Sequence, residues 1–451
     1  MTLPKTILQS LIGIIFFSGT VSAQQLKVSE NGRYLETKNG KPFFYLGDTA
    51  WELFHRLDRA EADLYLEDRA SKGFTVIQAV VLAERDGLND PNPYGETPLF
   101  DNDPTKPNEK YFEHVDYIVN KAESLGLVVG MLPTWGAYWS YLNKDNVIFN
   151  HKNALEYGEY LGRRYKDKPI IWILGGDRNI TNKEERKIIE AMVQGLRKGD
   201  EGNHLITFHP MGPGLSSDYF HDVAWLDFNM YQSSHAARDH DNGLYAEHDY
   251  RLEPTKPTLD GEPRYERIPV GFYFKDSDRI DRFDDYDARQ AAYWSILSGA
   301  CGHTYGNNSI WQMYSEEHKP VLWAKISWDM AIHHPGSWQM GYMKKMFTSR
   351  EFQKLVPNKD IVVDGPSTGG GKIKAALAND RSFAIVYSPR GEHFSIYKNV
   401  LNAEKLREIW FDPRYGVEHV IHTSGTKGIQ TYTPPSSGRG NDWVLIIEKV
   451  D

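Results

Sequence analysis

The sequence lacks several residue patterns that would signal other kinds of protein. Cys301 is its only cysteine, so no disulfide can form within the chain and 451 residues must be held together by a large core. It has no His-x-His pair and no His-Glu-x-x-His motif, which are ligand spacings of metal-dependent hydrolases. Two acidic stretches, 101–103 and 239–242, are interpreted as solvated loops rather than calcium sites. We therefore expect no metal or other cofactor, and we interpret Cys301 as a buried structural thiol.

Basic clusters are also missing. The chain has 61 acidic and 52 basic residues, which gives a formal net charge of −9. A protein of this charge, without a basic patch, is poorly suited to bind nucleic acid or an anionic membrane surface. We therefore predict no nucleic-acid partner.

Long hydrophobic runs are confined to the N-terminus. Residues 1–23 contain Lys5, an apolar stretch from Leu11 to Phe17, and the ending Val21-Ser22-Ala23. This pattern is typical of a secretory signal peptide, and the apolar stretch is too short to span a bilayer. No cysteine follows the predicted cleavage site that could carry a lipid anchor. We expect export to the periplasm without membrane insertion, and a monomer.

The mature chain alternates between short apolar runs and helical patterns from Phe43 onward. This alternation is typical of α/β folds with a parallel sheet. Two Asn-Gly pairs before it predict a short N-terminal β-hairpin element. Eight strands are predicted: Phe43–Leu46, Thr75–Leu82, Leu127–Leu132, Ile170–Leu174, Leu205–Phe208, Trp225–Met230, Pro257–Leu259 and Cys301–Tyr305. Eight such units over residues 24–356 predict a (β/α)8 TIM barrel.

The pattern of predicted secondary structure changes near Asn358. Short alternating strands separated by Gly, Pro, Ser and Asn follow, beginning with Ile361–Asp364 and ending with Trp443–Glu448. Residues 357–451 are therefore predicted to form a small C-terminal β-sandwich. We expect this domain to pack on the barrel as a structural partner.

Two of the predicted strands end in a carboxylate close to an arginine. The fourth run, Ile170–Leu174, leads into Gly175-Gly176-Asp177-Arg178, and the seventh leads into Asp260-Gly261-Glu262-Pro263-Arg264. Active sites of TIM barrels lie at the carboxyl ends of the strands, and strands 4 and 7 face each other across the barrel. A pair of carboxyl groups facing each other is the machinery of glycosidic bond hydrolysis. We assign Asp177 as acid/base and Glu262 as nucleophile, with Asp260 as the competitor of Glu262; a structural salt bridge at each strand end is the alternative.

The other predicted strand ends carry amides, aromatic rings and further polar groups. Such a mixture suits sugars, because aromatic faces cover C–H groups while amides and carboxylates bind hydroxyls. His209 could equally be a core histidine, and Asp48 could be a further carboxylate of the site. The predicted substrate-binding residues are Asp48, Trp51, Gln78, Trp135, Arg178, Asn179, His209, Tyr231, Gln232, Tyr305 and Asn307.

Three segments resemble glycoside hydrolase family 140, the apiosidase-like enzymes: Tyr45–Phe54, Tyr65–Phe74 and Leu174–Asn179. The resemblance covers essentially the whole mature chain, because Trp410–Gly416 and Asp442-Trp443 are similar to the C-terminal domain of these enzymes, which is named for collagen binding. It implies a (β/α)8 barrel that hydrolyses β-linked apiofuranose in rhamnogalacturonan II, a pectin, with Asp177 and Glu262 as the catalytic pair. It also implies a Gram-negative bacterium. Most of the larger superfamily has Asn-Glu at the acid position, whereas this chain has Gly176-Asp177, so Asn179 is a candidate for binding the 2-hydroxyl.

The sequence therefore predicts an exo-acting glycoside hydrolase that retains configuration and releases apiose. One alternative is the same chemistry on another terminal sugar, such as arabinofuranose or galactofuranose. The other is a non-catalytic carbohydrate- or matrix-binding protein, against which the presence of both carboxyl groups argues.

Overall fold

The computed structural model describes residues 25–450, so the predicted signal peptide lies outside the described residues. The described chain begins with a three-stranded antiparallel sheet of β1 (Leu26–Val28), β2 (Leu35–Thr37) and β3 (Pro42–Phe43). Gly32 and Gly40 of the two Asn-Gly pairs adopt positive φ angles of 69° and 78° in its turns. The predicted N-terminal antiparallel element is confirmed.

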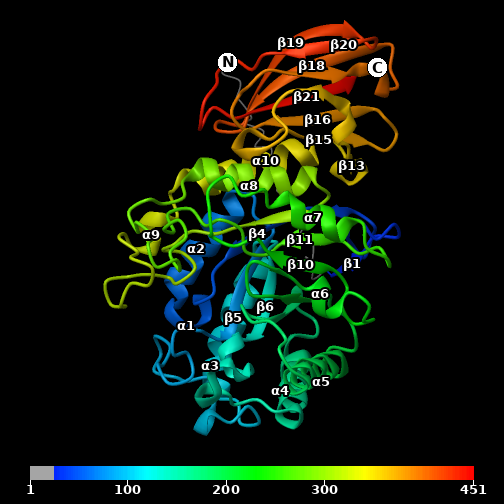
Figure 1. The fold of residues 1–451 in the computed structure, drawn as a ribbon. Helices are drawn as coiled ribbons and strands as arrows, with labels where there is room; N and C mark the ends of the chain where they lie inside the picture. The colour runs from blue at the N-terminus through cyan, green and yellow to red at the C-terminus, as the bar shows by residue number, and fades with distance from the viewer. Residues whose placement is uncertain (1–24, 451) are drawn as a thin grey trace, which may run out of the picture.

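Eight strands at or next to the predicted positions form a parallel barrel (Figure 1). The sixth was predicted four residues too early, because it runs from Asn229 to Gln232 and not from Trp225 to Met230. A ninth, β9 (Gly214–Leu215), pairs antiparallel with β10. The ring is nearly closed between β8 and β10, where Asp227 N donates to Ile206 O over 2.9 Å and Thr207 Oγ1 donates to Phe228 O over 2.7 Å. The barrel strands are β4 (Tyr45–Thr49), β5 (Val76–Leu82), β6 (Val128–Thr134), β7 (Ile170–Gly175), β8 (Ile206–His209), β10 (Asn229–Gln232), β11 (Thr258–Asp260) and β12 (Gly302–Tyr305).

Helices surround this barrel, and several of them begin at a residue whose side chain caps the helix. Asp58 accepts a hydrogen bond from Glu61 N over 2.8 Å and caps α2, and Asn108 caps α3. The helix after β7 is capped by Asn182, whose side chain accepts from two backbone N–H groups of the first turn. The helices are α1 (Leu53–Arg56), α2 (Arg59–Ser71), α3 (Glu109–Ser124), α4 (His151–Tyr165), α5 (Lys183–Gly199), α6 (Ser217–Phe220), α7 (Gly243–Tyr250), α8 (Asp285–Leu297), α9 (Trp328–Ala331) and α10 (Pro335–Thr348).

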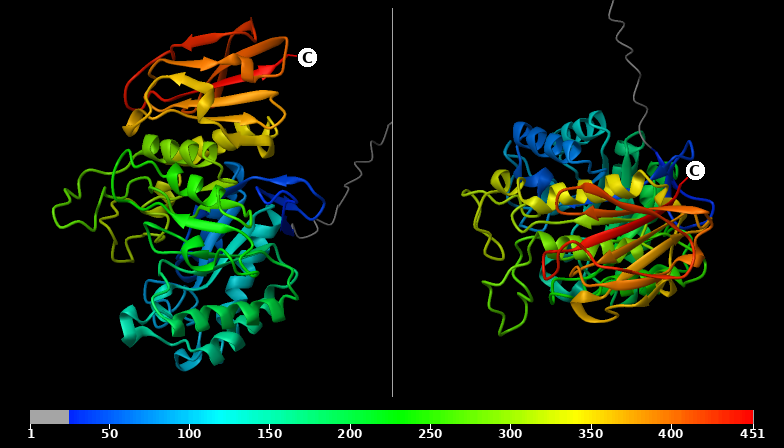
Figure 2. Two further views of the ribbon diagram at one scale, coloured as in Figure 1. Left: turned by 45° about the vertical axis from the view of Figure 1, so that its right-hand side comes forward. Right: turned by 90° about the horizontal axis from the view of Figure 1, so that it is seen from above.

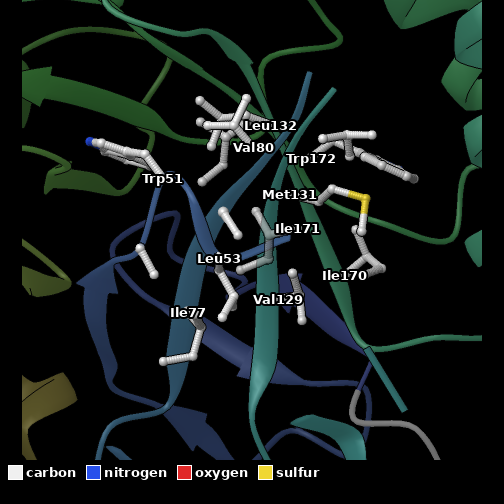
Figure 3. Packing of buried hydrophobic residues seen from close by; sticks show 14 of the residues in the cluster. Trp51, Leu53, Ile77, Val80, Val129, Met131, Leu132, Ile170, Ile171 and Trp172 are labelled. Atoms are coloured by element: carbon white, nitrogen blue, oxygen red, sulfur yellow. The ribbon is translucent and has the colours of Figure 1, made fainter. Parts of the chain in front are cut away.

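Buried hydrophobic side chains from neighbouring barrel strands pack together in the core (Figure 3). Trp172, Met131 and Ile171 are completely buried, as their positions within the apolar runs predict. Cys301 is also buried, at 3% exposure, in agreement with a structural thiol. Among residues 25–450, no helix is long and apolar enough to cross a membrane.

Helices α4 and α5 approach each other unusually closely because both carry glycines at the contact. A Cβ atom added to Gly195 of α5 would lie 2.1 Å from Leu155 O of α4, and one added to Gly158 of α4 would lie 2.5 Å from Met192 O. Neither position has room for a side chain. The glycines therefore allow the two backbones to pack directly against each other.

The C-terminal residues form two antiparallel sheets above the barrel (Figure 2). The larger sheet has the order β13-β15-β16-β21-β18-β19 and the smaller one the order β14-β17-β20. The predicted fold class, a TIM barrel followed by a β-sandwich, is confirmed. The strands are β13 (Leu355–Pro357), β14 (Val362–Asp364), β15 (Lys374–Ala378), β16 (Phe383–Ser388), β17 (Phe394–Tyr397), β18 (Lys405–Asp412), β19 (Val417–Gly425), β20 (Ile429–Tyr432) and β21 (Trp443–Lys449).

Helix α8 joins the sandwich to the barrel. Every residue from Tyr286 to Leu297 is buried. Arg289 Nη2 lies 2.8 Å from Asp442 Oδ1 of the sandwich in an ion pair that is almost completely buried. The rings of Tyr293 and Tyr387 stack with centroids 4.6 Å apart. The sandwich thus packs on the barrel through α8, as expected of a structural partner.

The loop at 239–242 belongs to this same interface, so its interpretation as a solvated loop is wrong. Asp239 Oδ2 accepts from Arg390 Nη2 over 2.7 Å, and Asp241 Oδ2 accepts from Lys372 Nζ over 2.5 Å. Both basic residues belong to the sandwich. The acidic side chains of this loop are therefore used for ion pairs between the two domains.

Candidate active site

A cavity of about 420 Å³ lies at the carboxyl ends of the barrel strands. This is within the size range of small-molecule sites, and it occupies the face where TIM barrels carry their active sites. Five predicted site residues line it: Asp177, Glu262, Trp51, Trp135 and Gln232. The structure therefore brings the two candidate carboxyl groups together in one pocket.

Asp177 enters the pocket through a tight turn at the end of β7. Gly175, Gly176 and Asp177 have positive φ angles of 95°, 79° and 58°. A Cβ atom on Gly175 would lie 2.3 Å from His209 O, and one on Gly176 would lie 2.9 Å from Gly136 N. The glycine at position 176 is thus required by the turn. Asp177 itself occupies a left-handed conformation that is uncommon for residues other than glycine, a form of strain that clusters at functional sites.

Glu262 lies two residues beyond β11 and contacts two histidines. His235 Nε2 lies 3.1 Å from Glu262 Oε1, and His209 Nε2 lies 3.2 Å from Glu262 Oε2, close but poorly aligned for a hydrogen bond. Asp177 N donates to His209 Nδ1 over 3.3 Å. Because Nδ1 of His209 accepts this bond, the proton of the neutral ring is on Nε2, which faces Glu262. His209 therefore links the backbone of one candidate carboxyl residue to the side chain of the other.

The surroundings separate the pKa values of the two carboxyl groups. Burial and the negative charge of Glu262 raise the pKa of Asp177 to about 7, against the opposing effects of His209 and Arg178. Burial would also raise the pKa of Glu262, but the contacts with His209 and His235 outweigh it and lower that pKa to about 2. Near pH 6 the site therefore holds one protonated and one ionised carboxyl group, the arrangement that an acid and a nucleophile require.

Asp260, the competitor of Glu262, lies outside the pocket. It is completely buried, and it accepts hydrogen bonds from Ser233 Oγ over 2.7 Å and from Asn242 Nδ2 over 2.9 Å. Its carboxyl group is thus used to hold neighbouring loops. The geometry favours Glu262 over Asp260.

Three predicted site residues support the pocket from behind. Arg178 Nη1 donates to Asp177 O over 2.6 Å and lies 3.3 Å from Asp177 Oδ2. Asn179 Oδ1 accepts from Met211 N over 3.0 Å, which fixes the loop after β8. Gln78 Nε2 donates to Gly261 O over 3.2 Å, so it crosses the barrel and holds the peptide directly before Glu262.

Four predicted site residues point into the helix layer instead. Asp48 is bound by Tyr65 and Arg69 of α2, and Tyr231 Oη lies 2.6 Å from Ser295 Oγ of α8. Tyr305 Oη donates to Glu266 Oε2, and Asn307 Nδ2 contacts His334 Nδ1 over 2.8 Å. None of the four lines the pocket. The three in strands occupy positions whose side chains face outward, because neighbouring residues of a strand point to opposite sides.

The aromatic wall of the pocket is formed by Trp51 and Trp135. Their ring centroids lie 5.6 Å apart, and the Trp51 ring meets the ring of His209 at 5.5 Å. Trp135 Nε1 has no hydrogen-bond partner among the described residues. The two indoles thus offer an apolar face beside the carboxyl groups.

Several residues that line the pocket were not predicted as site residues. They belong to loops beyond the strand ends: His235 and Ser234 after β10, Tyr265, Phe272 and Tyr273 after β11, and Leu322 after β12. Glu84, at the end of β5, adds a third carboxyl group, and burial, together with the charge of Glu52, raises its pKa to about 7. The sequence signal for Glu84 was its place just beyond a predicted strand. Within residues 25–450 no three His, Cys, Asp or Glu side chains are grouped so as to hold a metal ion.

Comparisons with known proteins agree with this geometry. The sequence matches the family described as "Apiosidase-like, catalytic domain" over residues 29–354, and the one described as "Putative collagen-binding domain of a collagenase" over residues 356–448. No curated protein matches the chain in sequence.

Solved structures are similar along nearly the whole chain. One, described as a glycoside hydrolase, is 33% identical with a TM-score of 0.86, covering 94% of this chain and 97% of its own. A family 5 glycoside hydrolase from Bacteroides vulgatus is 32% identical, also with a TM-score of 0.86, over 94% of this chain and 93% of its own. The chain therefore belongs to the apiosidase-like family and is a glycoside hydrolase.

Proposed function

We propose that this enzyme releases terminal apiose from the side chains of rhamnogalacturonan II with retention of anomeric configuration. The observation that carries the proposal is the pair of carboxyl groups in one pocket, with Asp177 protonated and Glu262 ionised near pH 6. The match to the apiosidase-like family supports apiose as the sugar. A pocket, rather than an open groove along the barrel, suits removal of a terminal residue.

The reaction follows from the protonation states. Asp177 donates its proton to the glycosidic oxygen as the bond to the leaving group breaks, and Glu262 attacks the anomeric carbon to form a glycosyl-enzyme ester. Asp177, now ionised, then takes a proton from water, and that water releases the sugar and restores Glu262. Two inversions at the same carbon give net retention. His209 and His235 keep Glu262 ionised for the first step.

The first test measures sugar release from rhamnogalacturonan II and its side-chain oligosaccharides. Wild type should release apiose, whereas Glu262→Ala should release none. Glu113→Ala, at an exposed position of α3, is the matched control and should behave as wild type. Release by Glu262→Ala at the wild-type rate would refute the role of Glu262.

Asp177→Ala separates the role of the acid from that of the nucleophile. Loss of a general acid lowers the rate by about 10²–10⁴-fold. The loss should be much smaller for an aryl glycoside, whose leaving group needs no proton. Equal losses on both substrates would contradict the assignment of Asp177 as the acid.

The identity of the sugar has its own test. A panel of terminal arabinofuranosides and galactofuranosides is assayed beside the apiosides. Turnover of one of these alone would retain the mechanism and replace apiose. Binding without turnover of any glycoside would favour a carbohydrate-binding protein instead.

We also propose that the enzyme acts in the periplasm as a monomer, after cleavage behind Ala23. Support comes from the N-terminal sequence pattern, Lys5 followed by an apolar stretch and Val21-Ser22-Ala23. Cell fractionation and N-terminal sequencing of the mature protein test this. Recovery in the cytoplasm with an intact N-terminus would refute it.

A further inference from the structure

A second cavity, of about 620 Å³, adjoins the catalytic pocket. Glu84 lines both cavities, so its side chain forms part of the wall between them. The other walls come from the loops after β5, β6 and β12 and from the end of α1, and most of the lining side chains are polar or charged. The two spaces are therefore neighbours at the same end of the barrel.

The second cavity lies on the side of the pocket where Asp177 enters. Ala137 and Tyr138 line it, and they directly follow Gly136, whose N–H donates to Gly176 O over 2.9 Å. Gly176 immediately precedes Asp177. Glu262, by contrast, is delivered by β11 and held by His235 after β10. Because the acid must reach the oxygen of the departing group, the departing group should lie on the side of Asp177.

Two adjacent side chains at the boundary lack hydrogen-bond partners among the described residues. The Glu84 carboxyl group and the Arg85 guanidinium make no hydrogen bond or ion pair with any residue in the range 25–450, although both residues are half-buried. Their hydrogen bonds come from the backbone: Arg85 N donates to Glu52 Oε1 over 3.0 Å, and Glu84 O accepts from Asp86 N over 2.9 Å. Partly buried carboxyl and guanidinium groups without hydrogen-bond partners are costly to maintain unless a ligand or water satisfies them.

We propose that the second cavity binds the sugar residue of the leaving group, with Arg85 donating to its oxygens and Glu84 bound to hydroxyls at the junction. This inference rests on the proposed function, because it takes Asp177 as the acid. The chemistry fits: a guanidinium offers five N–H donors and a carboxyl group accepts from hydroxyls, which together match the oxygen-rich surface of a sugar. Lys319, which also lines the second cavity, adds a further donor.

The test compares two substrates that share the glycosyl group and differ in the leaving group. One is a rhamnogalacturonan II side-chain oligosaccharide, and the other is 4-nitrophenyl β-D-apiofuranoside. Arg85→Ala should lower kcat/KM for the oligosaccharide about tenfold to a hundredfold, the range for losing hydrogen bonds to a charged group. The loss on the aryl glycoside should be at least tenfold smaller. Arg163→Ala, an exposed arginine of α4, is the matched control.

A binding measurement separates the subsite from the chemistry. Glu262→Ala should bind the oligosaccharide in a calorimeter, and the double variant with Arg85→Ala should bind it at least tenfold more weakly. Glu84→Gln, which keeps the shape of the side chain, should raise KM for the oligosaccharide more than it changes kcat. A circular dichroism spectrum like that of the wild type shows that each variant is folded.

The outcomes distinguish the two proposals. If wild type hydrolyses neither substrate, the proposed function fails. If wild type hydrolyses both and Arg85→Ala loses equal activity on each, or none, only the leaving-group subsite is wrong. A selective loss on the oligosaccharide, with weaker binding by the double variant, supports the subsite.

Discussion

Replacing His235 by alanine should move the acidic limb of the pH–activity profile to higher pH. His235 Nε2 contacts Glu262 Oε1 at 3.1 Å, and the Glu262 side chain is only 10% exposed, so water replaces this contact poorly. A hydrogen bond to a charged group contributes about 1.5–3 kcal/mol. Since one pKa unit corresponds to about 1.36 kcal/mol, the pKa of Glu262 should rise by about 1–2 units from about 2.

The direction in which the acidic limb moves follows from the role of Glu262. The nucleophile must be ionised, so activity is lost as pH falls through its pKa, and a higher pKa moves that loss to higher pH. The assay is kcat/KM for the aryl glycoside between pH 3 and 8, with circular dichroism at each pH to show that the protein is folded. His248→Ala, an exposed histidine of α7, is the matched control. His235→Gln, which keeps an N–H donor, should shift the limb less. An unmoved acidic limb in His235→Ala would refute the reasoning.

Three further predictions concern the basic limb and stability. Activity should fall as pH rises through about 7, where Asp177 loses its proton. Arg178→Ala should move this fall to higher pH, because the charge of Arg178 lowers the pKa of Asp177. An unchanged basic limb of the pH–activity profile in this variant would contradict the prediction. Arg289→Ala should lower the free energy of unfolding by about 3–5 kcal/mol in urea titrations, since it leaves the buried Asp442 without its cationic partner. A change below about 1 kcal/mol would show that the pair is unimportant. Gly195→Ala should lower the free energy of unfolding by about 1–3 kcal/mol through overpacking against α4. In an uncrowded helix the same substitution stabilises by about 1 kcal/mol. Increased stability in thermal unfolding would therefore refute the close helix contact.

The barrel could be predicted because its strands are buried on both faces. Such strands are near-continuous apolar runs, as in Ile170–Leu174, and they are visible without any knowledge of their neighbours. The edge strands β19 and β20 of the sandwich gave a weaker signal. Val420 and Ile429 are 61% and 64% exposed there, so their apolar character does not report burial. Sequence patterns thus detect buried strands more readily than strands that remain accessible.

The candidate site could be predicted only in part, for two physical reasons. The first is the alternation along a strand: Asp48 and Tyr305 stand near strand ends, but a shift of one residue decides whether a side chain faces the pocket or the helices. The second is that His235 and Tyr265 reach the pocket from loops, whose paths follow no periodicity. The two carboxyl residues, Asp177 and Glu262, were accessible to sequence reasoning because each lies within two residues of a strand end.

The burial of α8 determines how the chain can be divided. Because this barrel helix has no solvent-facing side from Tyr286 to Leu297, its outer surface is completed only by the sandwich. A chain cut after residue 354 would expose that apolar surface and leave Arg289 without Asp442, a combination that favours aggregation. The barrel and the sandwich thus form one structural unit. In evolution and in engineering, neither can be exchanged for an unrelated domain without redesigning the other.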